Sequence, residues 1–343
     1  MATYDIPGMA VGVLACGKSR VFDYGVESTT SQVAVSAGTL FEIGSISKAF
    51  TATLAAYAQD NGELSLNDKA SKFLPSLRGS SFGNVSLLHL ATYTPGGLPL
   101  QVPDAIGNSE QLMEYLQAWH PAYPPGTYRT YSNISIGVLG LITARSMGGD
   151  FAALVERRLL PALGMRNTYI NVPVQKMQRY AQGYTQDGTP IRLAPGVLWS
   201  EAYGIKTTAA DMLRFLAANM GLIKSSPSLQ RAMTATRTGY FQTAAMTQDL
   251  VWEQLPYPAA LQSLLAANAP AMIFEPQPAA ALQPAHKPRQ DVWINKTGST
   301  NGFGAYVAFV PQQRLAIVIL ANKSFPIAAR VTAAFAILQA AGQ

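Results

Sequence analysis

The sequence has few of the residues that most often mark a special chemistry or location. Cys16 is the only cysteine in 343 residues, so no intrachain disulfide can form. The three histidines, His89, His120 and His286, are scattered without the spacing of metal ligands, and we expect no metal site. No stretch approaches the ~20 apolar residues that span a bilayer, so we expect no membrane partner.

Charge is also scarce. Charged residues make up 13% of the chain, about half of the usual roughly 25%, while apolar residues make up 48%. The composition therefore excludes a coiled coil or a disordered chain. The net charge is +6, but the Lys and Arg residues are scattered and form no basic stripe. We expect no nucleic-acid partner, and a mildly basic surface that favours anionic small substrates.

The chain exceeds the length at which single cores usually stop growing, so we expect two lobes that share a cleft. Residues 8–14 and 20–26 have the pattern of a hairpin, and three more strands are expected at 291–295, 305–310 and 315–320, before a last helix at 328–341. The segments between these β-rich ends have helical patterns: 86–91, 109–119, 133–147, 151–163 and 209–220. Residues 268–289 are rich in Pro and Ala without a period, which predicts a long surface loop.

This order predicts an α+β fold of the α/β sandwich type. A largely antiparallel sheet flanked by helices would be built from residues 1–60 and 186–343, and residues 61–185 would form an inserted, mainly helical lobe. The active site would lie in the cleft between them.

Lys48 is the only charged residue between Ile43 and Gln59, a run whose small and apolar residues predict a helix buried on most sides. A buried ammonium must lose its proton or find acceptors. Ser45 precedes it by one helical turn, so hydroxyl and amine can meet, and a helix N-terminus favours negative charge on whatever the serine attacks. This arrangement is typical of an activated nucleophile. The alternative is a helix cap followed by a surface lysine.

Two further polar motifs could contribute to the same site. Tyr131-Ser132-Asn133 follows a Pro-Gly loop and precedes an apolar helix, where a phenol can point into a cleft or the triplet can simply cap the helix. Lys296-Thr297-Gly298 ends a predicted strand. It is either a solvated hairpin turn or an edge strand whose N–H groups face a ligand, with Gly298 allowing close approach.

In chain order, these three motifs resemble those of serine β-lactamases and penicillin-binding proteins. The flanking residues IPGMAVGVL, LFEIGSISKAFTATL, LATYTPGGLPLQVPD, AYGIKTT and NKTGSTNGFGAYVAFVP are similar to class C β-lactamases, over essentially the whole chain. The resemblance implies hydrolysis of the β-lactam ring of cephalosporins and penicillins through a serine acyl-enzyme, which confers antibiotic resistance. It also implies a monomer in the periplasm, with no cofactor and no metal.

The resemblance implies a role for each motif residue. Ser45 would attack the β-lactam carbonyl, and Lys48 and Tyr131 would pass its proton to the ring nitrogen; the sequence does not decide which of the two is the base. Lys296 and Lys48 would lower the pKa of Tyr131 from its usual ~10 towards neutrality. The N–H groups of Ser45 and Ser299 would form the oxyanion hole.

The resemblance also implies these substrate-binding residues: Gln101, Asn133, Tyr203, Thr297, Gly298, Ile327 and Arg330. The amides of Gln101 and Asn133 would hold the acylamino side chain of the antibiotic, and Tyr203 would form a wall of the cleft. Lys296, Thr297 and Arg330 would face the substrate carboxylate.

Two departures from the class C pattern matter. Ile327 stands where the family usually has asparagine, so we expect altered handling of bulky cephalosporin side chains. Family members also carry a secretory signal and a long helix before the IPGMAVGVL strand, where this sequence has only MATYD. On that basis we expect exposed sheet and C-terminal helix surface, and a lower unfolding midpoint than with the helix added.

Two rival functions remain open from the sequence. An esterase or D-amino-acid peptidase can use the same fold, although such esterases usually lack Lys-Thr-Gly. A penicillin-acylated receptor is the other, which the lack of an attached transmembrane segment or signalling domain disfavours.

Overall fold

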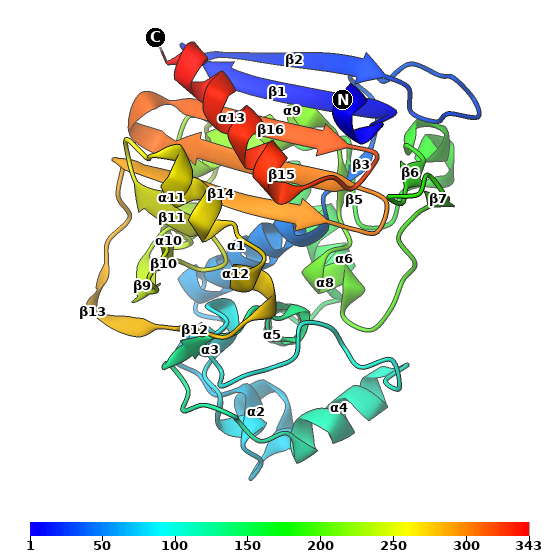
Figure 1. Cartoon of the computed structure of the whole chain (residues 1–343). Coiled ribbons are helices and arrows are strands. Elements are labelled where there is room, and N and C mark those ends of the chain that lie inside the picture. Colours follow the sequence, from blue (N-terminus) through cyan, green and yellow to red (C-terminus); the bar gives the residue numbers. More distant parts are fainter. Residues whose placement is uncertain (343) are drawn as a thin grey trace.

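Both ends of the chain meet in one sheet. In the computed structural model, which describes residues 1–342, nine antiparallel strands follow the order β13-β9-β10-β11-β14-β15-β16-β1-β2 (Figure 1). The first strand β1 pairs with the last strand β16, from Met9 opposite Ala321 to Leu14 opposite Ala316. The strands of this sheet are β1 (Gly8–Ala15), β2 (Lys18–Gly25), β9 (Gly239–Gln242), β10 (Thr247–Gln248), β11 (Glu253–Pro256), β13 (Ala280–His286), β14 (Val292–Ser299), β15 (Gly304–Val310) and β16 (Leu315–Ala321).

Shorter strands form three small sheets that are not part of the large one. Their members are β3 (Phe41–Glu42), β8 (Lys206–Thr207) and β5 (Thr168–Tyr169) in the first, β12 (Gln277–Pro278) and β4 (Tyr128–Arg129) in the second, and β6 (Gly183–Tyr184) and β7 (Pro190–Ile191) in the third. Strand β3 leads directly into the predicted nucleophile, and β8 pairs with it in register Glu42 opposite Lys206.

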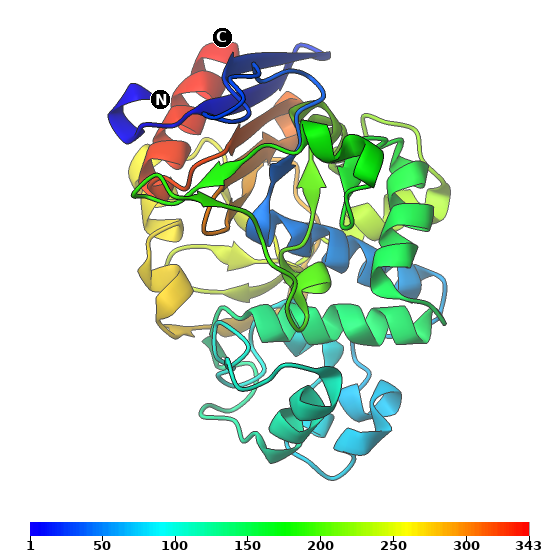
Figure 2. The ribbon, with the colours of Figure 1, turned by 90° about the vertical axis from the view of Figure 1, so that its right-hand side faces the viewer.

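The helices between Ser47 and Ser146 lie below the large sheet in Figure 1, whereas the helix Ala209–Asn219 lies behind its upper strands; Figure 2 shows the molecule turned by 90°. The helices are α1 (Ser47–Asp60), α2 (Ala70–Phe73), α3 (Leu87–Ala91), α4 (Ser109–Ala118), α5 (Asn133–Ser146), α6 (Phe151–Leu154), α7 (Leu160–Leu163), α8 (Trp199–Ala202), α9 (Ala209–Asn219), α10 (Pro227–Ala235), α11 (Leu261–Ala267), α12 (Ala271–Phe274) and α13 (Ile327–Ala341). A π-helical segment, Val155–Leu159, joins α6 to α7.

Helices cover both faces of the sheet, which explains why its central strands are apolar on both sides. Strand β16 (LAIVILA) is buried at every position. In β15, Tyr306 and Ala308 belong to a core with α11 and α13, whereas Val307 and Phe309 belong to the larger core with α1 and α9. Successive side chains of a strand point to opposite faces, so one strand supplies both cores.

The predicted fold class is confirmed: an antiparallel sheet flanked by helices, with the hairpin, the late strands and the last helix within a few residues of the expected positions. The division into residues 1–60 with 186–343 and residues 61–185 stays a prediction. Within residues 1–342 no single helix has both the length and the apolar character to cross a bilayer; α5 and Phe151–Leu163 meet these criteria only as a pair bent by 74°.

The prediction of a loop at 268–289 is wrong. This segment contains α12, β12 and β13, and β13 pairs with β9 at the edge of the large sheet. The side chains of β13 are exposed on both faces or only half-buried. An edge strand without a buried face has no alternation of apolar and polar residues, so the period that identifies other strands is missing.

Candidate active site

Ser45 and Lys48 meet at the start of the buried helix α1. Ser45 lies in a 3₁₀ turn, Gly44–Ile46, that continues into α1, so the α-helix starts two residues later than the serine. The Nζ of Lys48 donates to Ser45 Oγ at 2.8 Å and to the carbonyl of Ala202 at 2.9 Å. Lys48 is fully buried, and Ser45 is half-buried. The acceptors that a buried ammonium requires are therefore present, which excludes the surface-lysine alternative.

Tyr131 brings its ring between two ammonium groups. The Nζ of Lys48 lies 5.4 Å from the ring centroid, and that of Lys296 lies 4.9 Å from it. Burial alone would raise the pKa of Tyr131, but Lys296 and Lys48 outweigh it and lower this pKa to about 8. Burial lowers the pKa of Lys48 to about 8 as well, against the opposing effect of Tyr131. Both groups can therefore exchange a proton near neutral pH.

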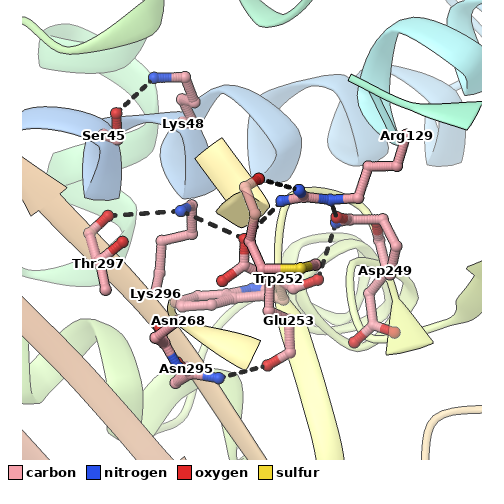
Figure 3. A network of polar contacts seen from close by, with 12 residues as sticks. Ser45, Lys48, Arg129, Asp249, Trp252, Glu253, Asn268, Asn295, Lys296 and Thr297 are labelled. Carbon is pink, nitrogen blue, oxygen red and sulfur yellow. Dashed lines mark hydrogen bonds and ion pairs between the residues drawn. The ribbon is translucent and has the colours of Figure 1, made fainter. Parts of the chain in front are cut away.

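The second lysine, Lys296, belongs to a buried ionic network with Glu253 and Arg129 (Figure 3). Lys296 Nζ lies 3.6 Å from Glu253 Oε1, and Arg129 donates to the same oxygen at 2.8 Å. Arg129 also donates to Gln248 and to the carbonyl of Met272, both at 2.6 Å. Two cations share one carboxylate here, so a net positive charge remains close to the Tyr131 ring.

Strand β14 passes unusually close to the turn that carries Ser45. A Cβ on Gly298 would lie 1.9 Å from the carbonyl oxygen of Ile43, and a Cβ on Gly44 would lie 2.6 Å from the N of Ser299. Gly44 also has a φ of +49°, which favours glycine. Only glycines allow the two backbones to approach so closely, and the approach brings the backbone of Ser299 beside the turn of Ser45.

These segments line a cavity of about 610 Å³. Of the predicted site residues, Ser45, Gln101, Tyr131, Asn133, Tyr203, Thr297, Gly298, Ser299 and Ile327 line it. Asn133 donates to Gln101 at 2.6 Å, and within residues 1–342 the Asn133 Oδ1 has no hydrogen-bond partner. Gln101 and Asn133 thus present an amide pair with a free acceptor to the cavity.

The expectation that Arg330 faces the cavity is wrong. Its guanidinium is 1% exposed and lies behind β14, where one nitrogen donates to the Gly298 carbonyl and to Ser299 Oγ, both at 2.8 Å. Only a glycine at position 304 leaves room for this guanidinium, because a Cβ there would lie 2.8 Å from it. Arg330 therefore supports the end of β14 from within the protein. Lys296 likewise lies under Tyr131 and does not line the cavity.

Several residues around the cavity carry no motif that identifies them in the sequence. Arg129 and Glu253 are 124 positions apart, so no spacing relates them. The apolar wall formed by Pro270, Ile273 and Phe274 falls in the segment predicted as a loop. Glu42 has a signal like that of Lys48, because it is a charged residue flanked by the apolar residues Phe41 and Ile43, and it can be found in the same way.

The described residues 1–342 contain no group of three or more His, Cys, Asp or Glu side chains that could hold a metal ion. The groups that the cavity and its surroundings present are the Ser45 hydroxyl, the Lys48 amine, the Tyr131 phenol and backbone N–H groups.

Comparison with known proteins agrees with this geometry. The family model described as Beta-lactamase matches residues 1–342. A β-lactamase of Lysobacter lactamgenus is 52% identical over 100% of this chain and 89% of its own length, and one of Pseudomonas fluorescens is 49% identical over 100% and 96%.

Solved structures give the same result. A class C β-lactamase in complex with cefoxitin superimposes with a TM-score of 0.97 at 49% identity, covering 99% of this chain and 95% of that one. A structure described as D-alanine carboxypeptidase AmpC from Burkholderia cenocepacia has a TM-score of 0.95 at 57% identity, again over 99% and 95%. Sequence and structure together show that the chain belongs to the class C β-lactamases, serine enzymes that hydrolyse the β-lactam ring.

Proposed function

We propose that Ser45 is the nucleophile of this β-lactamase and that Lys48 and Tyr131 together move its proton. The single observation that carries this assignment is the 2.8 Å contact between Nζ of the fully buried Lys48 and Oγ of Ser45, which lines the cavity. The proton leaves Oγ as the Ser45 oxygen bonds to the β-lactam carbonyl carbon, and it reaches the ring nitrogen when the C–N bond breaks. Water then hydrolyses the acyl-serine ester.

The oxyanion would be held by the N–H groups of Ser45 and Ser299. The support for this proposal is the close approach of Gly44 to Ser299, which sets two backbone segments around one point. Thr297 lines the cavity beside them and would bind the substrate carboxylate, with the buried Lys296 adding positive charge. Gln101 and Asn133 would hold the acylamino group, and Tyr203 would form a wall.

Two measurements test the assignment: the rate of nitrocefin hydrolysis, and the mass of the intact protein after incubation with a cephalosporin. We expect sustained hydrolysis by the wild type, and a covalent adduct on Ser45 when a slowly deacylated cephalosporin is added. A Ser45→Ala variant should bind the drug without forming an adduct. An adduct on any other residue would contradict the assignment, and a single stoichiometric burst without turnover would indicate a penicillin-acylated receptor.

A second activity, D-alanine carboxypeptidase, has a specific observation in its favour. Two solved structures with TM-scores of 0.95 and 0.97 carry that activity in their descriptions. The acyl-enzyme chemistry is the same, with a peptide carbonyl in place of the lactam. A peptide ending in D-Ala-D-Ala, assayed for released D-alanine beside nitrocefin and a p-nitrophenyl ester, separates the three activities.

Ile327 should influence which cephalosporins are accepted. Its side chain lines the cavity with Ile273 and Phe274 and cannot donate to a carboxylate, as an asparagine would. We expect Ile327→Asn to change kcat/KM for bulky oxyimino-cephalosporins by about tenfold, as expected for one pocket contact, and to change nitrocefin little. Unchanged constants for every oxyimino-cephalosporin would contradict this prediction.

We also propose that the enzyme acts as a monomer on small β-lactam substrates in the periplasm. The location is supported by the family alone, and the bacterial sources of the similar β-lactamases, such as Escherichia coli and Yersinia enterocolitica, are consistent with it. Sedimentation of the purified protein tests the oligomeric state.

A further inference from the structure

Glu42 is a buried carboxylate beside the nucleophile that the proposed mechanism does not use. It lies on β3, three residues before Ser45, and its side chain is 1% exposed between the fully buried Phe41 and Ile43. Within residues 1–342 it takes part in no ion pair. Because no cation in the described part of the chain lies within ion-pair distance, the oxygens of this buried carboxylate must be satisfied by hydrogen bonds, and these fix its position.

Three hydrogen bonds reach Glu42 from three separate segments. Its Oε1 accepts from the Tyr180 hydroxyl at 2.5 Å and from the Leu193 N–H at 2.8 Å. Its Oε2 accepts from the Thr300 hydroxyl at 2.6 Å. Burial and the Glu42 carboxylate both raise the pKa of Tyr180 well above its usual range, so this phenol stays a donor. All three partners thus donate to one fixed carboxylate.

Two of these partners line the cavity. Leu193 belongs to a wall segment that also contains Ile191, Arg192 and Ala194, and Thr300 directly follows Ser299. Glu42 itself precedes Gly44, the glycine that approaches Ser299. One side chain therefore connects the strand of the nucleophile, the end of β14 and a wall of the cavity.

We propose that Glu42 is a positioning residue, which holds Ser299–Thr300 and the Leu193 wall in place relative to Ser45. Through Thr300 it fixes where the Ser299 N–H points, and so it acts on the rate of acylation more than on substrate binding. The inference rests on the roles proposed for Ser45 and Ser299. Wild-type enzyme that is not acylated on Ser45 would refute those roles before any variant is made.

Glu42→Gln tests the proposal because the amide removes the charge and keeps only one acceptor oxygen, so Tyr180, the Leu193 N–H and Thr300 can no longer all donate to this side chain. We expect kcat for nitrocefin to fall by about 10²-fold, comparable to losing one oxyanion donor, with KM changed by less than about threefold. In hydrogen–deuterium exchange, the amide of Leu193 should exchange faster. This readout concerns Glu42 alone and does not depend on the identity of the nucleophile.

Thr300 variants keep the proposal testable if Glu42→Gln folds poorly. Thr300→Val removes the link to β14 and should lower kcat by about tenfold, whereas Thr300→Ser keeps the hydroxyl and should retain wild-type kcat within about twofold. The double variant Glu42→Gln/Thr300→Val should have a kcat no lower than that of Glu42→Gln alone, because both changes affect the same contact between Glu42 and Thr300.

Glu27 offers a matched control. It is also a buried glutamate, 7% exposed, that accepts from a threonine hydroxyl, that of Thr39, but neither residue lines the cavity. We expect Glu27→Gln to lower the unfolding midpoint without lowering kcat. The proposal is overturned by additive losses in the double variant, by unchanged exchange at Leu193, or by equal kcat losses in Glu27→Gln and Glu42→Gln.

Discussion

Lys48→Met should lower kcat/KM for nitrocefin by about 10³- to 10⁴-fold, the upper range for removing a group that transfers protons. Methionine has a similar length and suits a fully buried position, so the fold should persist. The loss arises because Ser45 Oγ no longer has the amine 2.8 Å away and the Tyr131 ring loses one of its two ammonium neighbours. Steady-state kinetics with circular dichroism as the check on folding measures it.

Lys72→Met is the matched control for this variant. Lys72 lies on the surface, where it pairs with Asp68 at 2.7 Å, and exposed pairs contribute little to stability. Its replacement should leave kcat/KM unchanged. If Lys48→Met instead kept more than about a tenth of the wild-type activity, Tyr131 alone would suffice as the proton carrier and the shared role would be wrong.

Lys296→Met should shift the ascending limb of the pH–rate profile to higher pH. The limb of the wild type is expected near pH 8, because the Tyr131 and Lys48 pKa values both lie at about 8. Removing the Lys296 charge destabilises the phenolate, so the pKa of Tyr131 rises and less of the basic form is present at neutral pH. At pH 7 we expect about a 10²-fold lower kcat/KM, with part of the loss recovered at alkaline pH.

Glu253→Gln should shift the ascending limb of the pH–rate profile in the opposite direction. The Glu253 carboxylate raises the pKa of Tyr131, so its neutralisation should move the limb to lower pH. If the limb shifted in the same direction in both variants, it would not reflect the ionisation of Tyr131. A limb that stays in place in Lys296→Met would contradict the electrostatic role of that lysine.

The sequence predicts the elements with a strong period or a special residue, and it fails where neither exists. Strands β15 and β16 are apolar on both faces and bounded by turns, so they are readily recognised. Lys48 stands out because a charge in an apolar helix is costly unless it has partners. Strand β13 has no buried face and therefore no signal.

Which way a side chain points is harder to predict from the sequence than whether its residue belongs near the site. Arg330 was expected at the substrate, but the backbone carbonyls of Gly298 and Ala305 hold its guanidinium inside the protein. Whether an arginine points into a cavity or behind its wall depends on packing between α13 and β14, which no sequence period encodes. The Arg129–Glu253–Lys296 network could not be predicted for the same reason, since its members meet only in the folded chain.

Pairing of the first long strand with the last one sets the order of events during synthesis. Until Leu315–Ala321 has left the ribosome, Gly8–Ala15 lacks its partner, and the lysine and glycines of β14 arrive almost as late. Contacts between residues some three hundred positions apart are slow to form, because a long loop must close first. Tyr131 is translated long before Lys296, so its ring gains its second ammonium neighbour only after residue 296 has been added.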